Sequence, residues 1–315
     1  LALLKLRREV QAIGAPSMAA GNSSVQDFIS KLPFSLTSAQ QRVIGEIGKD
    51  LSLTKPMLRL VQGDVGSGKT VVAASAAAQA INSGYQVAVM APTEILAEQH
   101  LHNFNQWFAG SGSGIDILTG KLKGKRRNLV LDNLLSGKTQ LLIGTHALFQ
   151  ADVHFHKLGF IIVDEQHRFG VHQRLALSEK VATGIGRPHQ LIMTATPIPR
   201  TLSMVAYADL DCSIIDELPP GRQAINTVLI DNQRRLDVID RAREACRNGR
   251  QAYWVCTLIE ESEALQCQAA EATATELSSE LPDIRVGLIH GRMSSTDKDQ
   301  IMASFKAGEI DLLVA

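Results

Sequence analysis

At 315 residues, with 45% hydrophobic and 20% charged residues, the chain has the composition of a globular protein and the length of two ordinary domains. Its formal net charge of zero excludes a uniformly basic nucleic-acid wrapper, although a local basic groove stays possible. No apolar run approaches the roughly 18 residues of a membrane span and no secretory signal is recognisable, so we expect a cytoplasmic protein with no membrane partner.

The spacing of cysteine and histidine does not indicate a metal site or a disulfide framework. The 4 cysteines include no C-x-x-C pair, and we interpret them as free thiols. His100 and His102 lie two residues apart, so on a helix their side chains point in different directions. His154 and His156 share that spacing and have no third ligand nearby in the sequence. We therefore do not expect metal binding by histidine.

The two ends of the chain suggest a piece of a longer protein. The chain opens without a methionine, and residues 1–13 are apolar and basic at helical spacing. Residues 14–24 have the composition of a linker. We expect residues 1–24 to be a helix and linker from an upstream domain. The apolar run at residues 312–315 resembles an unfinished strand.

The globular part is predicted to start at Val25, and its first helix carries a candidate adenine contact. Thr37 is a predicted helix N-cap, which places Gln40 in the first turn. A planar amide can pair with both the N6 donor and the N7 acceptor of adenine. Phe34 could stack on the same ring. The alternative is that Gln40 is simply solvated at the start of a helix.

The chain is organised around residues 57–83, which are predicted to form a short apolar strand, a glycine-rich turn and an alanine-rich helix. Glycines let successive N–H groups face phosphate oxygens, and the helix that follows aims its positive dipole end at the same anion. The turn fits the pattern G-x-x-x-x-G-K-[ST] and supplies the predicted ATP contacts Gly63, Gly66, Gly68, Lys69 and Thr70. Lys69 is expected to reach the β and γ phosphates, and Thr70 to hold Mg²⁺. A chance match in a loop is the alternative.

Strands and helices then alternate strictly. Strands are predicted at residues 86–91, 115–118, 139–144, 158–163 and 190–193. This alternation predicts the α/β class, with a parallel, doubly wound sheet. Ligands of such sheets bind beyond the carboxyl ends of the strands, and polar motifs follow each of these predicted strands.

An acidic pair, Asp164 and Glu165, ends the apolar strand in LGFIIVDE. Asp164 is expected to hold Mg²⁺ through its water shell, and Glu165 to orient or deprotonate the water that attacks ATP. Together with Lys69 they are the predicted catalytic residues. A solvated strand end is the alternative interpretation.

A break in composition divides the chain into two predicted domains. The segment DELPPGRQ, residues 216–223, has two prolines and a glycine and is typical of a linker. It separates a domain over residues 25–215 from a second, incomplete one over residues 224–315. In the second domain, strands are predicted at residues 227–230, 252–257, 285–290 and 310–315, and helices near residues 234–247, 261–279 and 296–306.

Several of these motifs resemble those of superfamily 2 helicases and translocases. Residues 63–70, 164–167 and 194–196 look like motifs I, II and III, with Gln40 in the place of the adenine-reading glutamine. Longer matches, which include RLVQGDVGSGKT, APTEILAEQH, DEQHRFGVHQR, MTATPIPRTL and HGRM, resemble the RecG family of branched-DNA helicases over residues 32–315. The resemblance implies two tandem RecA-like domains of the P-loop NTPase class.

The resemblance also implies residues for coupling and for DNA binding. His167, Thr194 and Thr196 would couple the nucleotide site to DNA. The first domain would contact DNA, mainly its phosphates, through Pro92, Thr93, Gly120, Thr145 and His146, and the second through His290 and Arg292. Threonine hydroxyls, glycine N–H groups and helix N-termini can donate hydrogen bonds to DNA phosphates without contacting the bases. The basic run KLKGKRR, residues 121–127, could extend these contacts, and a solvated loop is its alternative.

The function implied by the resemblance is that of a monomeric motor that uses ATP and Mg²⁺ to regress stalled replication forks and to branch-migrate Holliday junctions. Compared with the family pattern, the chain lacks the rest of motif V, motif VI with its arginine finger, and the N-terminal wedge domain. We therefore expect the chain by itself to bind ATP and hydrolyse it slowly. Two alternatives stay open, a transcription-repair coupling translocase and an ATP-gated binding module that does not translocate.

Overall fold

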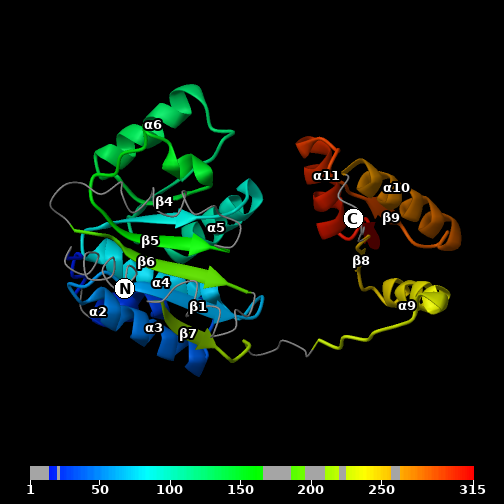
Figure 1. The fold of residues 1–315 in the computed structure, drawn as a ribbon, viewed down its shortest axis with the longest axis horizontal. Helices are drawn as coiled ribbons and strands as arrows, with labels where there is room; N and C mark the ends of the chain where they lie inside the picture. Colours follow the sequence, from blue (N-terminus) through cyan, green and yellow to red (C-terminus); the bar gives the residue numbers. More distant parts are fainter. Residues whose placement is uncertain (1–13, 20–21, 166–185, 196–209, 220–224, 257–262) are drawn as a thin grey trace, which may run out of the picture. The chain divides into compact units, whose positions relative to one another are not determined.

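The computed structural model describes residues 14–19, 22–165, 186–195, 210–219, 225–256 and 263–315 (Figure 1). The predicted coupling residues His167 and Thr196 and the predicted N-terminal helix at residues 1–13 lie outside the described residues. The chain divides into two compact units, Leu1–Gln223 and Ala224–Ala315.

The first unit is built on one parallel sheet of seven strands in the order β3-β4-β2-β5-β6-β1-β7. The predicted parallel α/β sheet is confirmed. Its strands are β1 (Leu58–Gly63), β2 (Gln86–Met90), β3 (Gly114–Leu118), β4 (Thr139–Gly144), β5 (Leu158–Asp164), β6 (His189–Thr194) and β7 (Asp211–Ile215). The helices are α2 (Asn22–Ser30), α3 (Ser38–Leu51), α4 (Lys69–Asn82), α5 (Glu94–Trp107) and α6 (Gly124–Leu135), with a short 3₁₀ helix η1 (His146–Phe149).

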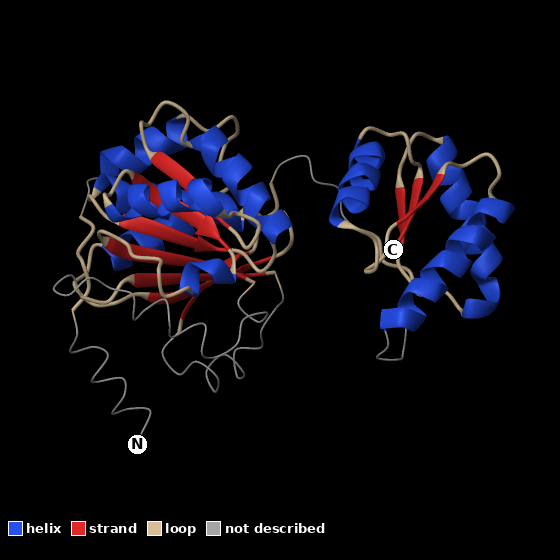
Figure 2. Cartoon of the chain, turned by 90° about the horizontal axis from the view of Figure 1, so that it is seen from above, coloured by secondary structure: helices blue, strands red, loops and turns tan. Residues whose placement is uncertain are grey.

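Helices cover both faces of this sheet (Figure 2). Successive side chains of a strand point to opposite faces, so Val87 and Val89 enter one core while Ala88 and Met90 enter the other. Helices α2 to α5 contribute to the first core, and α6 and η1 to the second. Strands that are covered on both faces are nearly continuous apolar runs, as in LGFIIV of β5.

Helix α4 is buried along almost its whole length because its side chains are small. Alanines such as Ala73, Ala77 and Ala80 are fully buried, and α4 contacts both α2 and α3 as well as the sheet. The start of α3 follows the predicted pattern. The Thr37 hydroxyl accepts the N–H of Gln40, and the Gln40 side chain accepts the N–H of Thr37, so the predicted N-cap is confirmed as a capping box.

Residues 14–19, which we expected to belong to a linker, form backbone hydrogen bonds with the first unit. The N–H of Ala15 donates to the carbonyl of Thr54 at 2.7 Å, and the N–H of Met18 donates to the carbonyl of Leu51 at 2.8 Å. Met18 is fully buried. The segment therefore packs on the first unit, because its backbone groups find partners at the end of α3 that linker-like composition does not reveal.

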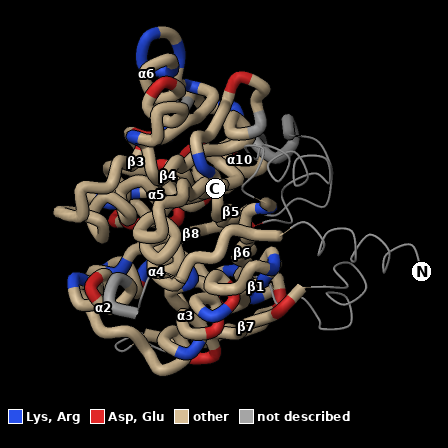
Figure 3. The backbone as a smooth tube through the Cα atoms, turned by 90° about the vertical axis from the view of Figure 1, so that its left-hand side faces the viewer, with Lys and Arg blue, Asp and Glu red and all other residues tan. Residues whose placement is uncertain are grey.

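Helix α2, helix α6, the 3₁₀ helix η1 and strand β7 of the first unit were not predicted. Strand β7 is short and mostly exposed at the edge of the sheet, so its apolar residues show no clear period. Helix α6 starts inside the basic run, at Gly124, so the alternative of a solvated loop does not hold for residues 124–127. Figure 3 shows Lys and Arg positions at this end of α6.

The second unit has a parallel sheet of three strands in the order β8-β10-β9. Its strands are β8 (Ala252–Trp254), β9 (Val286–Leu288) and β10 (Leu312–Val314), and its helices are η3 (Asn232–Arg234), α9 (Arg235–Arg247), α10 (Glu263–Glu280) and α11 (Ser295–Lys306). The strand predicted at residues 227–230 is wrong. Leu229 is 100% exposed, and no strand of the described residues pairs with this segment, which leaves its backbone without the ladder that a strand requires.

Candidate active site

The phosphate-loop sequence forms the turn between β1 and α4. Gly66 and Gly68 have φ angles of 77° and 88°, a region that favours glycine. A Cβ atom at Gly68 would lie 2.2 Å from Nε2 of Gln40, so a side chain there would strike the capping amide of α3. The loop therefore depends on glycine for both its backbone conformation and its closeness to α3.

The groups around this loop fit a polyphosphate. Ser67 is fully buried, and its hydroxyl has no hydrogen-bond partner within the described part of the chain. No side chain caps the first turn of α4, so the N–H groups there face outward from a positive helix end. Lys69 reaches back across the loop, with Nζ donating to the carbonyls of Gly63 at 2.7 Å and Asp64 at 3.0 Å. Thr70 follows in the first turn of α4 and is half-buried.

The predicted adenine contact lies directly beside this loop. Gln40 is buried, and its Nε2 donates to the carbonyl of Ser67 at 2.8 Å. Its amide therefore joins the capping box of α3 to the phosphate loop. Phe34 is 46% exposed and meets the ring of Trp107 edge-on, with the centroids 6.4 Å apart. Adenine binding by Gln40 and Phe34 stays a prediction.

The acidic pair lies at the carboxyl end of β5. The Glu165 carboxylate accepts the N–H of Ala195 at 3.2 Å and the hydroxyl of Thr194 at 3.3 Å. Glu165 has a φ of 49°, which is uncommon for a residue with a side chain. The strand ends of β5 and β6 thus bring the predicted catalytic Glu165 and the predicted coupling residue Thr194 together.

Asp164 has a partner that the sequence reasoning missed. Its Oδ2 lies 2.8 Å from Nε2 of His100, which is buried on α5. The spacing of His100 and His102 carried no signal for this contact, because the two partners are far apart in the sequence. The Asp164 and Thr70 side chains are oxygen ligands of the kind that Mg²⁺ prefers.

The predicted DNA contacts of the first unit gather at three neighbouring strand ends. Pro92 and Thr93 follow β2, Gly120 follows β3, and Thr145 and His146 follow β4. Strands β3, β4 and β2 are adjacent in the sheet. The phosphate loop, the acidic pair and the predicted coupling residue Thr194 lie at the ends of β1, β5 and β6, which are also adjacent. Because all the strands are parallel, the two sets occupy two halves of one sheet edge.

Local contacts hold together the half of this edge that carries the predicted DNA contacts. The Thr93 hydroxyl caps α5 by accepting the N–H of Leu96 at 3.3 Å. The next residue, Glu94, accepts the N–H of Lys121 at 3.2 Å and pairs with its ammonium group at 3.2 Å. The basic run is thereby joined to the start of α5 beside Gly120. At its other end, Arg127 pairs with Asp152 at 2.7 Å.

Other groups of this edge differ in their exposure. Thr145 is buried with no partner for its hydroxyl among the described residues, and His146 is exposed. In the second unit, His290 lies 3.5 Å from a carboxylate oxygen of Glu271, and Arg292 is exposed. DNA binding by these residues stays a prediction.

Among the described helices, none is long and apolar enough to cross a membrane.

Two family models match the chain. The model for the DEAD/DEAH box helicase family matches residues 37–205, which include the phosphate loop and the acidic pair. The chain belongs to the DEAD/DEAH box helicase family. The model for the helicase conserved C-terminal domain matches residues 234–315. The expectation of two tandem RecA-like helicase domains is confirmed.

Several ATP-dependent DNA helicases are similar in sequence to the chain over its whole length. It is 58% identical to the ATP-dependent DNA helicase RecG of Escherichia coli and 46% identical to that of Aquifex aeolicus, with 100% of the chain covered in both comparisons. The chain spans 46% and 39% of those relatives. The resemblance to RecG found in the motifs is confirmed.

Solved structures agree with this assignment. A structure of RecG bound to a three-way DNA junction matches with a TM-score of 0.81 and 38% identity, over 100% of this chain and 41% of that one. The Mycobacterium smegmatis helicase Lhr, bound to single-stranded DNA and AMP-PNP, matches with a TM-score of 0.65 and 18% identity, over 96% of this chain and 42% of that one. The second likeness concerns the fold alone.

Proposed function

We propose that the chain is the motor part of an ATP-dependent DNA helicase that moves along duplex DNA at branched structures. The observation that carries this proposal is that one edge of the sheet has two halves. One half contains the glycine-rich loop predicted to bind the phosphates of ATP, and the other contains the groups predicted to bind the phosphates of DNA. Within the phosphate-loop half, Glu165 contacts Thr194 at the end of β6. The strand before Glu165, β5, lies next to β2 of the other half. Similarity to RecG supports DNA as the substrate.

In this proposal ATP binds with its phosphates on the loop Gly63–Thr70. Lys69 would turn from the loop carbonyls to the phosphates and balance their charge, while Gln40 and Phe34 would hold the adenine. Bound Mg²⁺, held by Thr70 and through water by Asp164, supplies charge neutralisation at the transferred phosphate. Glu165 would orient the attacking water.

The finer part of the proposal concerns the substrate. We infer that the longer protein regresses stalled replication forks and branch-migrates Holliday junctions, which fits the structure of its relative RecG on a three-way junction. Slow hydrolysis by the 315-residue chain alone belongs to the same proposal. The monomeric state and the cytoplasmic location stay expectations.

The test is the rate of ATP hydrolysis with no DNA, linear duplex, single-stranded DNA and a three-way junction, each at a stated salt concentration because phosphate contacts weaken with salt. It would be measured on this chain and on a form that spans the length of its relatives. We expect the longer form to respond most strongly to the junction. Lys69→Ala should abolish hydrolysis and spare DNA binding, because the lysine lies at the phosphate loop and outside the half of the edge with the predicted DNA contacts.

Other outcomes would favour the alternatives. Equal stimulation by linear duplex and junction would favour a transcription-repair coupling translocase. ATP binding without turnover in the longer form would favour an ATP-gated binding module. No stimulation by any DNA would contradict the motor proposal.

A further inference from the structure

His100 is a buried polar side chain that the proposed reaction scheme does not use. It lies on α5, is 5% exposed, and its Nε2 lies 2.8 Å from Oδ2 of Asp164 at the end of β5. Its partner is the carboxylate proposed to hold Mg²⁺. The contact crosses from a helix to the sheet and joins residues that are 64 positions apart.

The protonation pattern of the ring follows from this contact. An ionised carboxylate can only accept, so Nε2 of His100 carries the hydrogen and donates it to Asp164. Nδ1 is buried and has no hydrogen-bond partner among the described residues. The ring of His100 lies 6.5 Å from that of Phe104. If the side chain only filled space there, an apolar ring would be more stable, because a buried nitrogen without a hydrogen bond costs free energy. The bond to Asp164 is therefore a contact that histidine makes here and that an apolar ring would not make.

The contact also limits how Asp164 can turn. With Oδ2 occupied by the His100 donor, Oδ1 is the oxygen that remains for the water shell of a metal ion. Side chains that orient a metal-holding group in this way tune metal affinity without touching the metal. His100 is itself held by α5, whose first turn carries the Thr93 cap and the Glu94 pair with Lys121.

We propose that His100 is a positioning residue that orients the Asp164 carboxylate for Mg²⁺ and thereby sets the Mg²⁺ dependence of ATP binding. This inference rests on the proposed function, because it requires Mg²⁺ and ATP at the phosphate loop. It adds a residue of α5, outside the phosphate loop and the acidic pair, to the groups that control the nucleotide.

The test uses the full chain and measures the affinity for a fluorescent, non-hydrolysable ATP analogue during a Mg²⁺ titration and in EDTA. His100→Phe keeps a ring beside Phe104 and removes the donor. We expect it to raise the Mg²⁺ concentration required for tight binding by about 10-fold, as for other groups that orient metal ligands. Affinity in EDTA should be unchanged. His100→Gln offers an amide N–H near the position of Nε2 and should restore most of the Mg²⁺ dependence.

Two controls separate positioning from packing. His102→Phe makes the same substitution at an exposed position of α5 and should leave the titration unchanged. In an Asp164→Asn background, His100→Phe should have little further effect on the titration, because two residues that act through one contact are not additive. Binding of linear duplex DNA by each variant reports whether α5 has kept its structure.

The outcomes distinguish this inference from the proposed function. Normal binding of the analogue by the wild-type chain, with the same Mg²⁺ titration in His100→Phe, would overturn the inference and leave the proposed function intact. An equal loss of affinity with Mg²⁺ and in EDTA would also overturn it, since that result describes packing. A wild-type chain that bound no analogue at any Mg²⁺ concentration would overturn the proposed function itself.

Discussion

His189, at the start of β6, shows how one side chain ties the N-terminal segment to the sheet. Its Nδ1 accepts the N–H of Met57 at 3.1 Å, and its Nε2 donates to the carbonyl of Pro16 at 2.8 Å. Both bonds together require the neutral ring, which has one donor and one acceptor. Burial lowers the pKa of His189 below its usual value of 6.5, against the opposing effects of the Pro16 carbonyl and of Asp50.

This lowered pKa predicts a stability that depends on pH. Below pH 6.5 the unfolded chain binds a proton at His189 before the folded chain does, so the free energy of unfolding should fall as the pH drops from 6.5 toward the lowered pKa. One proton accounts for at most about 1.4 kcal/mol per pH unit. Urea unfolding of the wild type and of His189→Gln, measured at several pH values, checks this. The variant should show a flatter dependence, and equal slopes would contradict the prediction.

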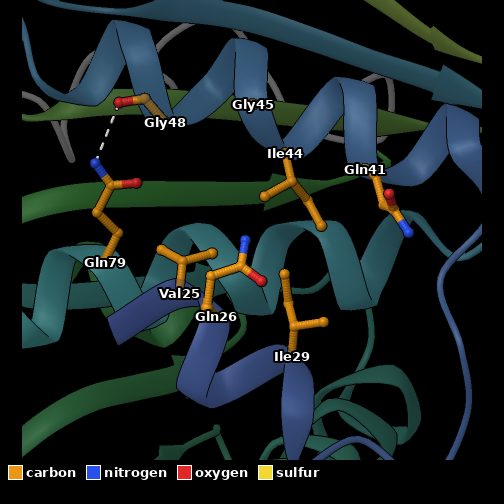
Figure 4. Close-up of a pocket in the computed structure, with 8 residues that line it drawn as sticks. All are labelled: Val25, Gln26, Ile29, Gln41, Ile44, Gly45, Gly48 and Gln79. Atoms are coloured by element: carbon orange, nitrogen blue, oxygen red, sulfur yellow. Dashed lines mark hydrogen bonds between the residues drawn. The ribbon is translucent and has the colours of Figure 1, made fainter. Parts of the chain in front are cut away.

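Helix α3 shows how a single element connects the glycine-rich loop at Gly63–Thr70 to the rest of the first unit. Its first turn holds Gln40 against the phosphate loop, while its later turns face α2 and α4 across a pocket of about 380 Å³ (Figure 4). The Gln79 amide reaches the Gly48 carbonyl at 3.1 Å and the Met18 carbonyl at 2.8 Å. Two glycines, Gly45 and Gly48, lie along this face.

These two glycines predict different outcomes for the same substitution. A Cβ atom at Gly45 would have no atom within 4 Å, so Gly45→Ala should raise the free energy of unfolding by about 0.5–1 kcal/mol through helix propensity alone. A Cβ atom at Gly48 would lie 3.1 Å from Oε1 of Gln79, whose amide is already engaged. Gly48→Ala should therefore gain less or destabilise. Urea unfolding of both variants checks this, and an equal gain in both would contradict it.

At the scale of the whole molecule, the two units differ in how much they bury. The first has a core on each face of a seven-stranded sheet, whereas the second has one smaller core beside three strands. The chain has 2 tryptophans, and each unit contains one, Trp107 in the first and Trp254 in the second. Each tryptophan can therefore report the unfolding of its own unit.

We expect the second unit to unfold at a lower urea concentration than the first, because hydrophobic stabilisation grows with the apolar area that a domain buries. Fluorescence of Trp254→Phe would follow the first unit through Trp107, and fluorescence of Trp107→Phe would follow the second through Trp254. Circular dichroism of both variants controls for destabilisation by the substitutions. Coincident transitions in the two variants would show instead that the units unfold together.

The parallel α/β architecture, the glycine-rich loop and the acidic strand end could all be predicted from the amino-acid sequence. These features depend on local chemistry, since glycine conformation, helix capping and the period of apolar residues act over a few neighbouring positions. The Thr37 capping box and the helix after Gly68 formed as expected for the same reason.

How these local features meet depends on packing between segments that are distant in the sequence. The order of the strands divides the sheet edge into its two halves, and no motif spacing determines that order. The contact of His100 with Asp164 and the docking of residues 14–19 join segments far apart in the chain. Conversely, residues 227–230 have a strand-like composition and no neighbouring strand in the described part of the chain. Propensity describes single segments, whereas partners are chosen by the packing of the whole fold.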